Sequence, residues 1–160
     1  MLVELITTGS ELLLGEIVNE NSRYLSKELN RLGYSVVYHT TVGDNPERME
    51  QVFRTALSRA DIVITTGGLG PTQGDVTKIV GAKVMDAPLE YHPDIVEGIR
   101  QWVKEHHPSR ELTENQKRQA MIPAGADIFS NGAGTAPGVA IHKGGKLLVH
   151  LPGPPTEMRW

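Results

Sequence analysis

The first half of the chain alternates between apolar runs and segments of helical periodicity. Runs rich in β-branched residues at positions 2–8, 35–41 and 61–66 are typical of strands buried in a parallel sheet. Between them, apolar residues recur at helical spacing from 24 to 32, before a glycine, and from 49 to 57, after the helix-opening pair Asn45-Pro46. This alternation predicts an α/β fold, a mostly parallel sheet with helices on both faces.

The second half of the chain is less regular. Pro93 opens a helix with apolar residues on one face up to Trp102 and Val103, which we interpret as core, and residues 113–116 fit a capping box for a short helix. Strands are expected at 126–129, 138–141 and 147–151, with a hairpin turn at 143–146. The sheet should therefore be mixed, with an antiparallel excursion.

Composition narrows the class of protein. The 160 residues fit a single domain, 1–160, and Pro154-Pro155 opens a helix near Trp160, so we expect the sequence to be truncated from a longer protein. The chain has no cysteine, which excludes disulfides, thiolate nucleophiles and Cys-ligated zinc. A net charge of -3 without a basic block argues against nucleic-acid binding, and no apolar run could cross a membrane. We expect a soluble, cytoplasmic protein.

The strongest functional signal is a glycine-rich loop after the strand at 61–66. It holds four glycines within eight residues, 67–74, whereas a turn needs only one or two. Glycines let backbone N–H groups approach an anion closely, and a following helix N-terminus adds partial positive charge. We expect Asp75 to be the N-cap of that helix, over about 76–83. Ligand binding is favoured over a purely structural turn.

Two common phosphate-binding motifs do not fit this loop. It lacks the G-K-[ST] ending of a Walker loop, and the segment 68–73 misses the last glycine of the dinucleotide fingerprint. Neither an ATPase nor a Rossmann dehydrogenase is supported.

Three polar or Gly/Pro-rich loops follow predicted strands, at 8–11, 65–75 and 151–155. In a parallel sheet they share the carboxyl edge, and a strand order beginning 2-1-3 would place the first two at a ligand-binding switch point. A fourth segment, 131–138, is placed to close over that point. The candidate ligand- or phosphate-binding residues are Gly9, Ser10, Glu11, Thr66, Gly67, Gly68, Leu69, Gly70, Pro71, Thr72, Gly134, Thr135, Ala136, Pro137, Gly138, Pro152, Gly153 and Pro154.

Three carboxylates, Glu11, Asp44 and Asp75, are expected on the same edge. Carboxylates beside phosphates imply a divalent cation such as Mg²⁺, with Asp75 and Glu11 as metal ligands and Asp75 and Asp44 as catalytic candidates. Each acid also has an alternative role: Asp75 as a helix cap, Asp44 in shaping its turn, and Glu11 as a solvated side chain.

Other polar residues carry weaker signals. Ser10 has no G-x-S-x-G context, so it is interpreted as a hydrogen-bonding group for phosphate or backbone and not as a nucleophile. The six histidines show no metal-ligand spacing and are interpreted as structural or exposed.

Five segments together resemble the N-terminal domain of the CinA (competence/damage-inducible) family, in the molybdopterin-binding, MoaB/Mog-like superfamily. They are GSELLLG at 9–15, NEN at 19–21, TGGLGPTQGDVT at 66–77, GTAPG at 134–138 and LPGPPTEM at 151–158. The resemblance covers nearly the whole chain. It implies a three-layer α/β/α sandwich, and Asp75 matches the acid that precedes x-Thr in the family. Two departures are Gly74, where many members carry a second acid, and Gly132, where a proline is usual.

The resemblance implies two possible functions. CinA-like domains are associated with metal-dependent hydrolysis of ADP-ribose to AMP and ribose 5-phosphate, so the leading expectation is a nucleotide pyrophosphatase. The alternative is a pterin-phosphate-binding domain of molybdenum-cofactor biosynthesis, by binding or adenylyl transfer, and a third possibility is an assembly or regulatory platform. The partner would be a nucleotide or pterin phosphate, and a homodimer or homotrimer is expected. The deamidase domain that CinA proteins often carry is not represented in these residues.

Overall fold

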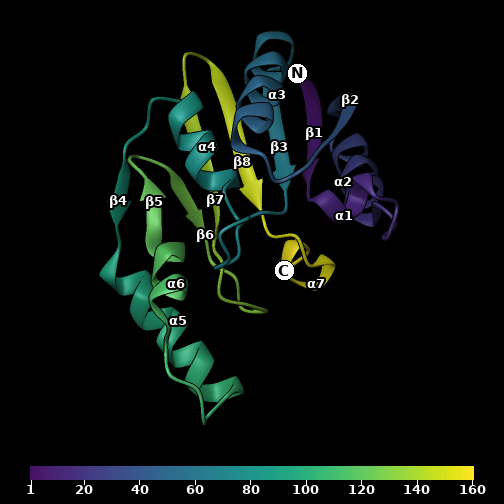
Figure 1. The fold of residues 1–160 in the computed structure, drawn as a ribbon. Helices are drawn as coiled ribbons and strands as arrows, with labels where there is room; N and C mark the ends of the chain where they lie inside the picture. The colour runs from purple at the N-terminus through teal and green to yellow at the C-terminus, as the bar shows by residue number, and fades with distance from the viewer.

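Six strands form one mixed sheet in the computed structural model, which describes residues 1–160. The strands are β1 (Leu2–Thr8), β2 (Ser35–Val42), β3 (Ile62–Thr66), β6 (Asp127–Phe129), β7 (Gly138–Lys143) and β8 (Lys146–Leu151). Their order is β2-β1-β3-β8-β7-β6 (Figure 1). The first four are parallel, whereas β7 and β6 are antiparallel to their neighbours. The 2-1-3 order and the antiparallel excursion are both confirmed.

Helices cover both faces of this sheet, which confirms the three-layer prediction (Figure 1). Side chains alternate along β1, so Ile6 packs in a cluster with α3 (Pro46–Arg59) and α4 (Thr77–Val84). Val3 and Leu5 point to the opposite face, toward α2 (Glu20–Arg31). Two short helices, α1 (Ser10–Leu13) and α7 (Pro155–Met158), follow β1 and β8 at the carboxyl edge.

A smaller unit extends away from the sheet and contains α5 (Pro93–His106), α6 (Glu114–Lys117) and the 3₁₀ turn η1 (Arg118–Ala120) (Figure 1). It also holds a two-stranded antiparallel sheet of β4 (Leu89–Tyr91) and β5 (Met121–Pro123), which the sequence did not predict. Val96, Ile99 and Val103 of α5 are buried as predicted, whereas Trp102 is only partly buried and stacks on His106, with ring centroids 4.2 Å apart.

Local chemistry explains several boundaries. The side chain of Asn45 accepts the N–H of Arg48 at the start of α3, and Thr113 forms the predicted capping box with Gln116. The glycines of the β7–β8 hairpin have φ of +55° and +75°, as a type I′ turn requires. These boundaries were predictable because each depends on a residue type that suits only that position.

One charged side chain lies inside the sheet layer. Glu4 of β1 is fully buried, and its carboxylate accepts two hydrogen bonds of 2.8 Å from Arg59 and one from the hydroxyl of Thr40. The pair joins β1, β2 and the end of α3, so the buried charge is compensated. No helix in the structure combines the length and apolarity that a membrane-spanning segment needs.

Candidate functional site

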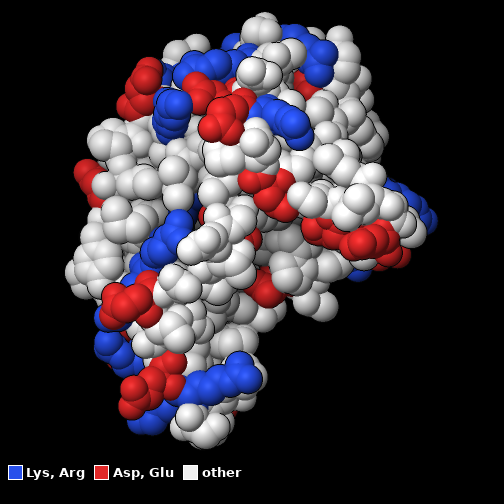
Figure 2. Space-filling model, in the orientation of Figure 1, with Lys and Arg blue, Asp and Glu red and all other residues white.

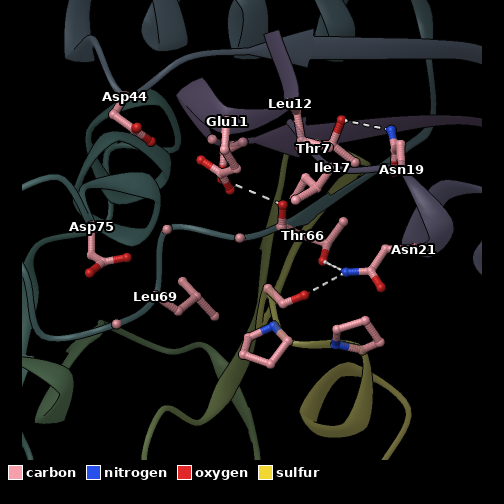
Figure 3. A pocket seen from close by; sticks show the side chains of 18 of the residues that line it. Thr7, Glu11, Leu12, Ile17, Asn19, Asn21, Asp44, Thr66, Leu69 and Asp75 are labelled. Carbon is pink, nitrogen blue, oxygen red and sulfur yellow. Dashed lines mark hydrogen bonds between the residues drawn. The ribbon is translucent and has the colours of Figure 1, made fainter. Parts of the chain in front are cut away.

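A cavity of about 900 Å³ opens at the carboxyl ends of β1 and β3, where the sheet order reverses direction (Figure 3). Loops after β1, β2, β3 and β8 meet around it, together with the start of α2. Twelve of the candidate residues line it: Gly9, Glu11, Asp44, Thr66, Gly67, Gly68, Leu69, Gly70, Thr72, Asp75, Gly153 and Pro154. The structure thus gathers most of the predicted site, while the binding of a ligand there stays a prediction.

Part of the glycine content of the loop 67–74 has a packing reason. Gly67 and Gly68 have φ of +107° and +65°, and a Cβ on Gly67 would lie 2.4 Å from the carbonyl oxygen of Thr8. A Cβ on Gly68 would lie 2.1 Å from Oγ1 of Thr77. These two glycines let the loop pass close to β1 and α4.

The same loop also presents unused donors. The N–H group of Gly67 bonds to the carbonyl of Leu151, but those of Gly68, Leu69 and Gly70 make no hydrogen bond within the chain. Three successive N–H groups without partners, on residues that line a cavity, are donors available to an anion. This backbone feature supports the predicted phosphate cradle.

Two asparagines fasten the cavity wall, and neither was among the predicted site residues. Asn19 caps α2 by accepting the N–H of Ser22 and donates to Oγ1 of Thr7. Asn21 donates to Oγ1 of Thr66 at 2.8 Å and to the carbonyl of Gly153 at 2.7 Å (Figure 3). Both asparagines belong to the NEN segment that carries the family resemblance. An N-cap pattern could also have identified Asn19, whereas the bonds of Asn21 cross the fold and have no local pattern.

The prediction that Asp75 caps the following helix is wrong. The N-cap of α4 is Val76, without a side-chain bond. Asp75 instead uses Oδ2 to accept the N–H of Thr72 at 2.8 Å and its hydroxyl at 2.6 Å. The chain makes this extra turn before the helix begins, and the second carboxylate oxygen, Oδ1, makes no hydrogen bond within the chain.

Asp44, which lines the cavity, is hydrogen-bonded to Ser10, which does not. Oδ2 of Asp44 accepts the N–H of Ser10 at 3.1 Å and its hydroxyl at 2.8 Å. The hydroxyl of Ser10 donates to Asp44 and accepts the backbone N–H of Asp44 at 3.4 Å, so Ser10 has the backbone role predicted as an alternative. The predicted shaping role of Asp44 is present, and its Oδ1 also makes no hydrogen bond within the chain.

The carboxylates do not form a preassembled metal centre. Glu11 lines the cavity and its side chain makes no hydrogen bond, but no three acidic or histidine side chains are grouped closely enough to hold a metal ion by themselves. Glu20 adds a fourth acid to the lining, which contains no lysine or arginine. Figure 2 shows acidic side chains in and beside the hollow.

The wall opposite the glycine loop is apolar. Leu12, Ile17 and Val18 line it, and Ile17 and Val18 are 53% and 83% exposed. Sequence reasoning missed this wall because the short helix α1 and the loop after it were not predicted.

The segment 131–138 does not close over the cavity, which corrects the placement of Gly134, Thr135, Ala136, Pro137 and Gly138. Asn131 donates to Glu157 of α7 at 2.8 Å and to the carbonyl of Ala136, so the segment packs beside α7. It borders a separate groove of about 390 Å³ next to α5. Pro71 and Pro152 also lie outside the cavity lining.

Comparisons with known proteins agree with this architecture. Residues 4–160 match a family described as a probable molybdopterin binding domain. A CinA-like protein of Dictyoglomus thermophilum is 47% identical over 158 residues, 99% of this chain and 38% of that protein. The chain therefore spans less than half the length of this relative.

Solved structures extend the comparison. The structure of the protein CinA from Thermoplasma acidophilum has a TM-score of 0.90 and 34% identity, and the likeness covers 99% of this chain and 93% of that one. The molybdopterin biosynthesis enzyme MoaB of Thermus thermophilus has a TM-score of 0.64 and 21% identity, over 99% of this chain and 84% of that one. The second likeness shows the shared fold alone.

Proposed function

Because the chain belongs to the molybdopterin-binding domain family, in its CinA-like branch, we propose that its cavity binds a pterin phosphate or a similar phosphorylated heterocycle. The observation that carries this proposal is the row of free N–H groups at Gly68, Leu69 and Gly70. They lie on a cavity whose volume, about 900 Å³, is in the range of small-molecule sites.

The two walls of the cavity suggest an orientation for the ligand. The phosphate end would lie on the glycine loop, where backbone donors can bind its oxygens. The ring would lie against Leu12, Ile17 and Val18, because removing their apolar surfaces from water favours binding. Backbone donors recognise phosphate without identifying the ring, so this wall would contribute to the choice of ligand.

A divalent cation would accompany the ligand. Four carboxylates line the cavity without a basic side chain, so a bare phosphate would be repelled. Asp44 and Asp75 each have one oxygen free of hydrogen bonds, and Mg²⁺ commonly takes one or two carboxylates together with phosphate oxygens and water. The donors present therefore fit an ion shared with the ligand. Once bound, the ion would neutralise phosphate charge and make water more acidic.

A second candidate function is the metal-dependent hydrolysis of ADP-ribose or a similar dinucleotide to AMP and a sugar phosphate. What favours it is the position of Asp44 and Asp75 on the lining that also holds the glycine loop, since their free oxygens could orient a cation and accept a proton from water. Asp75 would be the first residue to test for this role.

One set of titrations separates these functions. Calorimetry with a pterin phosphate, AMP and ADP-ribose, each with and without Mg²⁺, should show metal-dependent binding of the pterin phosphate. Chromatography of the ADP-ribose mixtures would detect AMP. Absence of binding for all three ligands would refute the first proposal, and binding of ADP-ribose without AMP release under several divalent ions would refute the second.

A further inference from the structure

The glycine loop is held from the side away from the main cavity. The carbonyl oxygen of Gly68 accepts the N–H of Thr77 at 3.2 Å, and the carbonyl oxygen of Leu69 accepts Nε2 of Gln119 at 3.3 Å. Because a trans peptide unit is planar, its N–H group points opposite to its carbonyl. The N–H groups of Leu69 and Gly70 belong to these two units, so both are directed away from α4 and η1.

Gln119 reaches the loop from the smaller unit of the fold. It lies in η1, fifty positions along the chain from Leu69, and is 2% exposed. Gln119 lines a small cavity behind the loop, and its Oε1 is buried without a hydrogen-bond partner. Burying an amide oxygen without a partner costs free energy of folding. The hydrogen bond to Leu69 is the one that the Gln119 side chain makes.

Lys78 holds Gln119 in turn. This side chain of α4 is 7% exposed, and Nζ donates to the backbone carbonyl of Gln119 at 2.6 Å. Burial lowers the pKa of Lys78 to about 8. Thr77 and Lys78 are adjacent in α4, so one turn of helix anchors the loop directly at Gly68 and indirectly, through Gln119, at Leu69.

We propose that Gln119, supported by Lys78, is a positioning residue that turns the Leu69–Gly70 peptide unit so that its N–H group faces the ligand's phosphate. The proposal rests on the function proposed above, the binding of a phosphorylated ligand in the main cavity. Gln119 lines only the cavity behind the loop and does not touch that ligand.

The test uses magnesium pyrophosphate as the probe and Gln119→Met as the variant, because methionine has similar length but no donor. Gln101→Met, on the exposed surface of α5, is the matched control. Gln119→Met should weaken binding about tenfold in calorimetry, as expected for one hydrogen bond to a charged group. In ¹⁵N–¹H spectra, the amides of Leu69 and Gly70 should shift on binding in the wild type and the control, and Gly70 should shift much less in Gln119→Met.

The outcomes are distinguishable. If wild-type protein does not bind magnesium pyrophosphate, this inference is overturned, whereas the proposed function is judged separately by the titrations with the pterin phosphate, AMP and ADP-ribose. If the wild type binds and Gln119→Met binds equally well with the same shift at Gly70, only the positioning role is overturned. Should Gln119→Met not fold, Lys78→Met decides the question: a severalfold loss of affinity supports the role, and unchanged affinity overturns it.

Discussion

The loop 67–74 and the segment 131–138 are both rich in glycine, with four and three glycines in eight residues. The first follows parallel strand β3, lines the main cavity and leaves three N–H groups without partners. The second precedes antiparallel strand β7 and packs beside α7, where Gly134 is buried next to Glu157. A glycine-rich composition therefore does not identify a ligand loop. Its place after a parallel strand at the switch point is the informative feature.

Replacing one glycine in each segment by alanine gives the largest expected effect and distinguishes the two segments directly. In Gly68→Ala the new Cβ would meet Oγ1 of Thr77 at a backbone φ of +65°, so we expect a loss of about 2–3 kcal/mol in the free energy of unfolding, together with loss of phosphate binding. Gly134→Ala is the control, because its Cβ would displace the carboxylate of Glu157 and should destabilise the protein without changing affinity. Urea unfolding and calorimetry measure both quantities. Equal losses of affinity in the two variants would contradict the distinction.

We expect the stability of the fold to depend on pH through a buried histidine of the sheet. His150 of β8 is fully buried, its Nδ1 bonds to Thr65, and burial, with a smaller effect of the charge on Lys78, lowers its pKa to about 3. The unfolded chain therefore binds more protons between about pH 6.5 and 3, and stability falls as the pH falls through this window. From pH 7 to pH 5 the loss should be about 2 kcal/mol.

This loss should arise in the shared core and not in either glycine-rich segment. His150→Asn, whose amide can replace the bond from Nδ1 to Thr65, should be less stable at pH 7 but should lose less stability on acidification. Urea unfolding at pH 7, 6 and 5 measures the slope. An unchanged slope in the variant would show that His150 is not the source.

Asp75 tests whether the loop at 67–74 works with a cation. Asp75→Asn keeps an oxygen to accept the bonds from Thr72 but removes the charge, so stability should change little. Affinity for ADP-ribose in Mg²⁺ should fall about tenfold, or 1.4 kcal/mol, while affinity without Mg²⁺ should not fall. Asp94→Asn, beside the groove that 131–138 borders, should leave both affinities unchanged. Equal losses with and without Mg²⁺ would argue against metal binding by Asp75.

The sequence predicted those parts of the fold whose cause is local. The β-branched runs of β1, β2 and β3, the helical spacing of α3 and the caps at Asn45 and Thr113 each follow from neighbouring residues. The convergence of three loops then followed from the parallel arrangement of the strands. What it did not show were bonds between distant segments, such as Ser10 to Asp44 and Gln119 to Leu69. Such bonds have no sequence period, so the packing of 131–138 beside α7 became visible only in the fold.

Gly74 offers the smallest and most specific test of the ligand loop. A Cβ there would meet nothing closer than 3.9 Å, where its neighbours are Cβ of Asp44 and Oγ1 of Thr72, so Gly74→Asp can be accommodated and would place a new carboxylate beside Asp44. We expect magnesium-dependent affinity for ADP-ribose to rise about threefold to fivefold, and affinity without Mg²⁺ to fall because like charges repel. Gly74→Asn is the uncharged control of the same size. If Gly74→Asp and Gly74→Asn respond alike to Mg²⁺, the cation does not bind between residues 44 and 74, and the charge of the cavity must be compensated elsewhere along its lining.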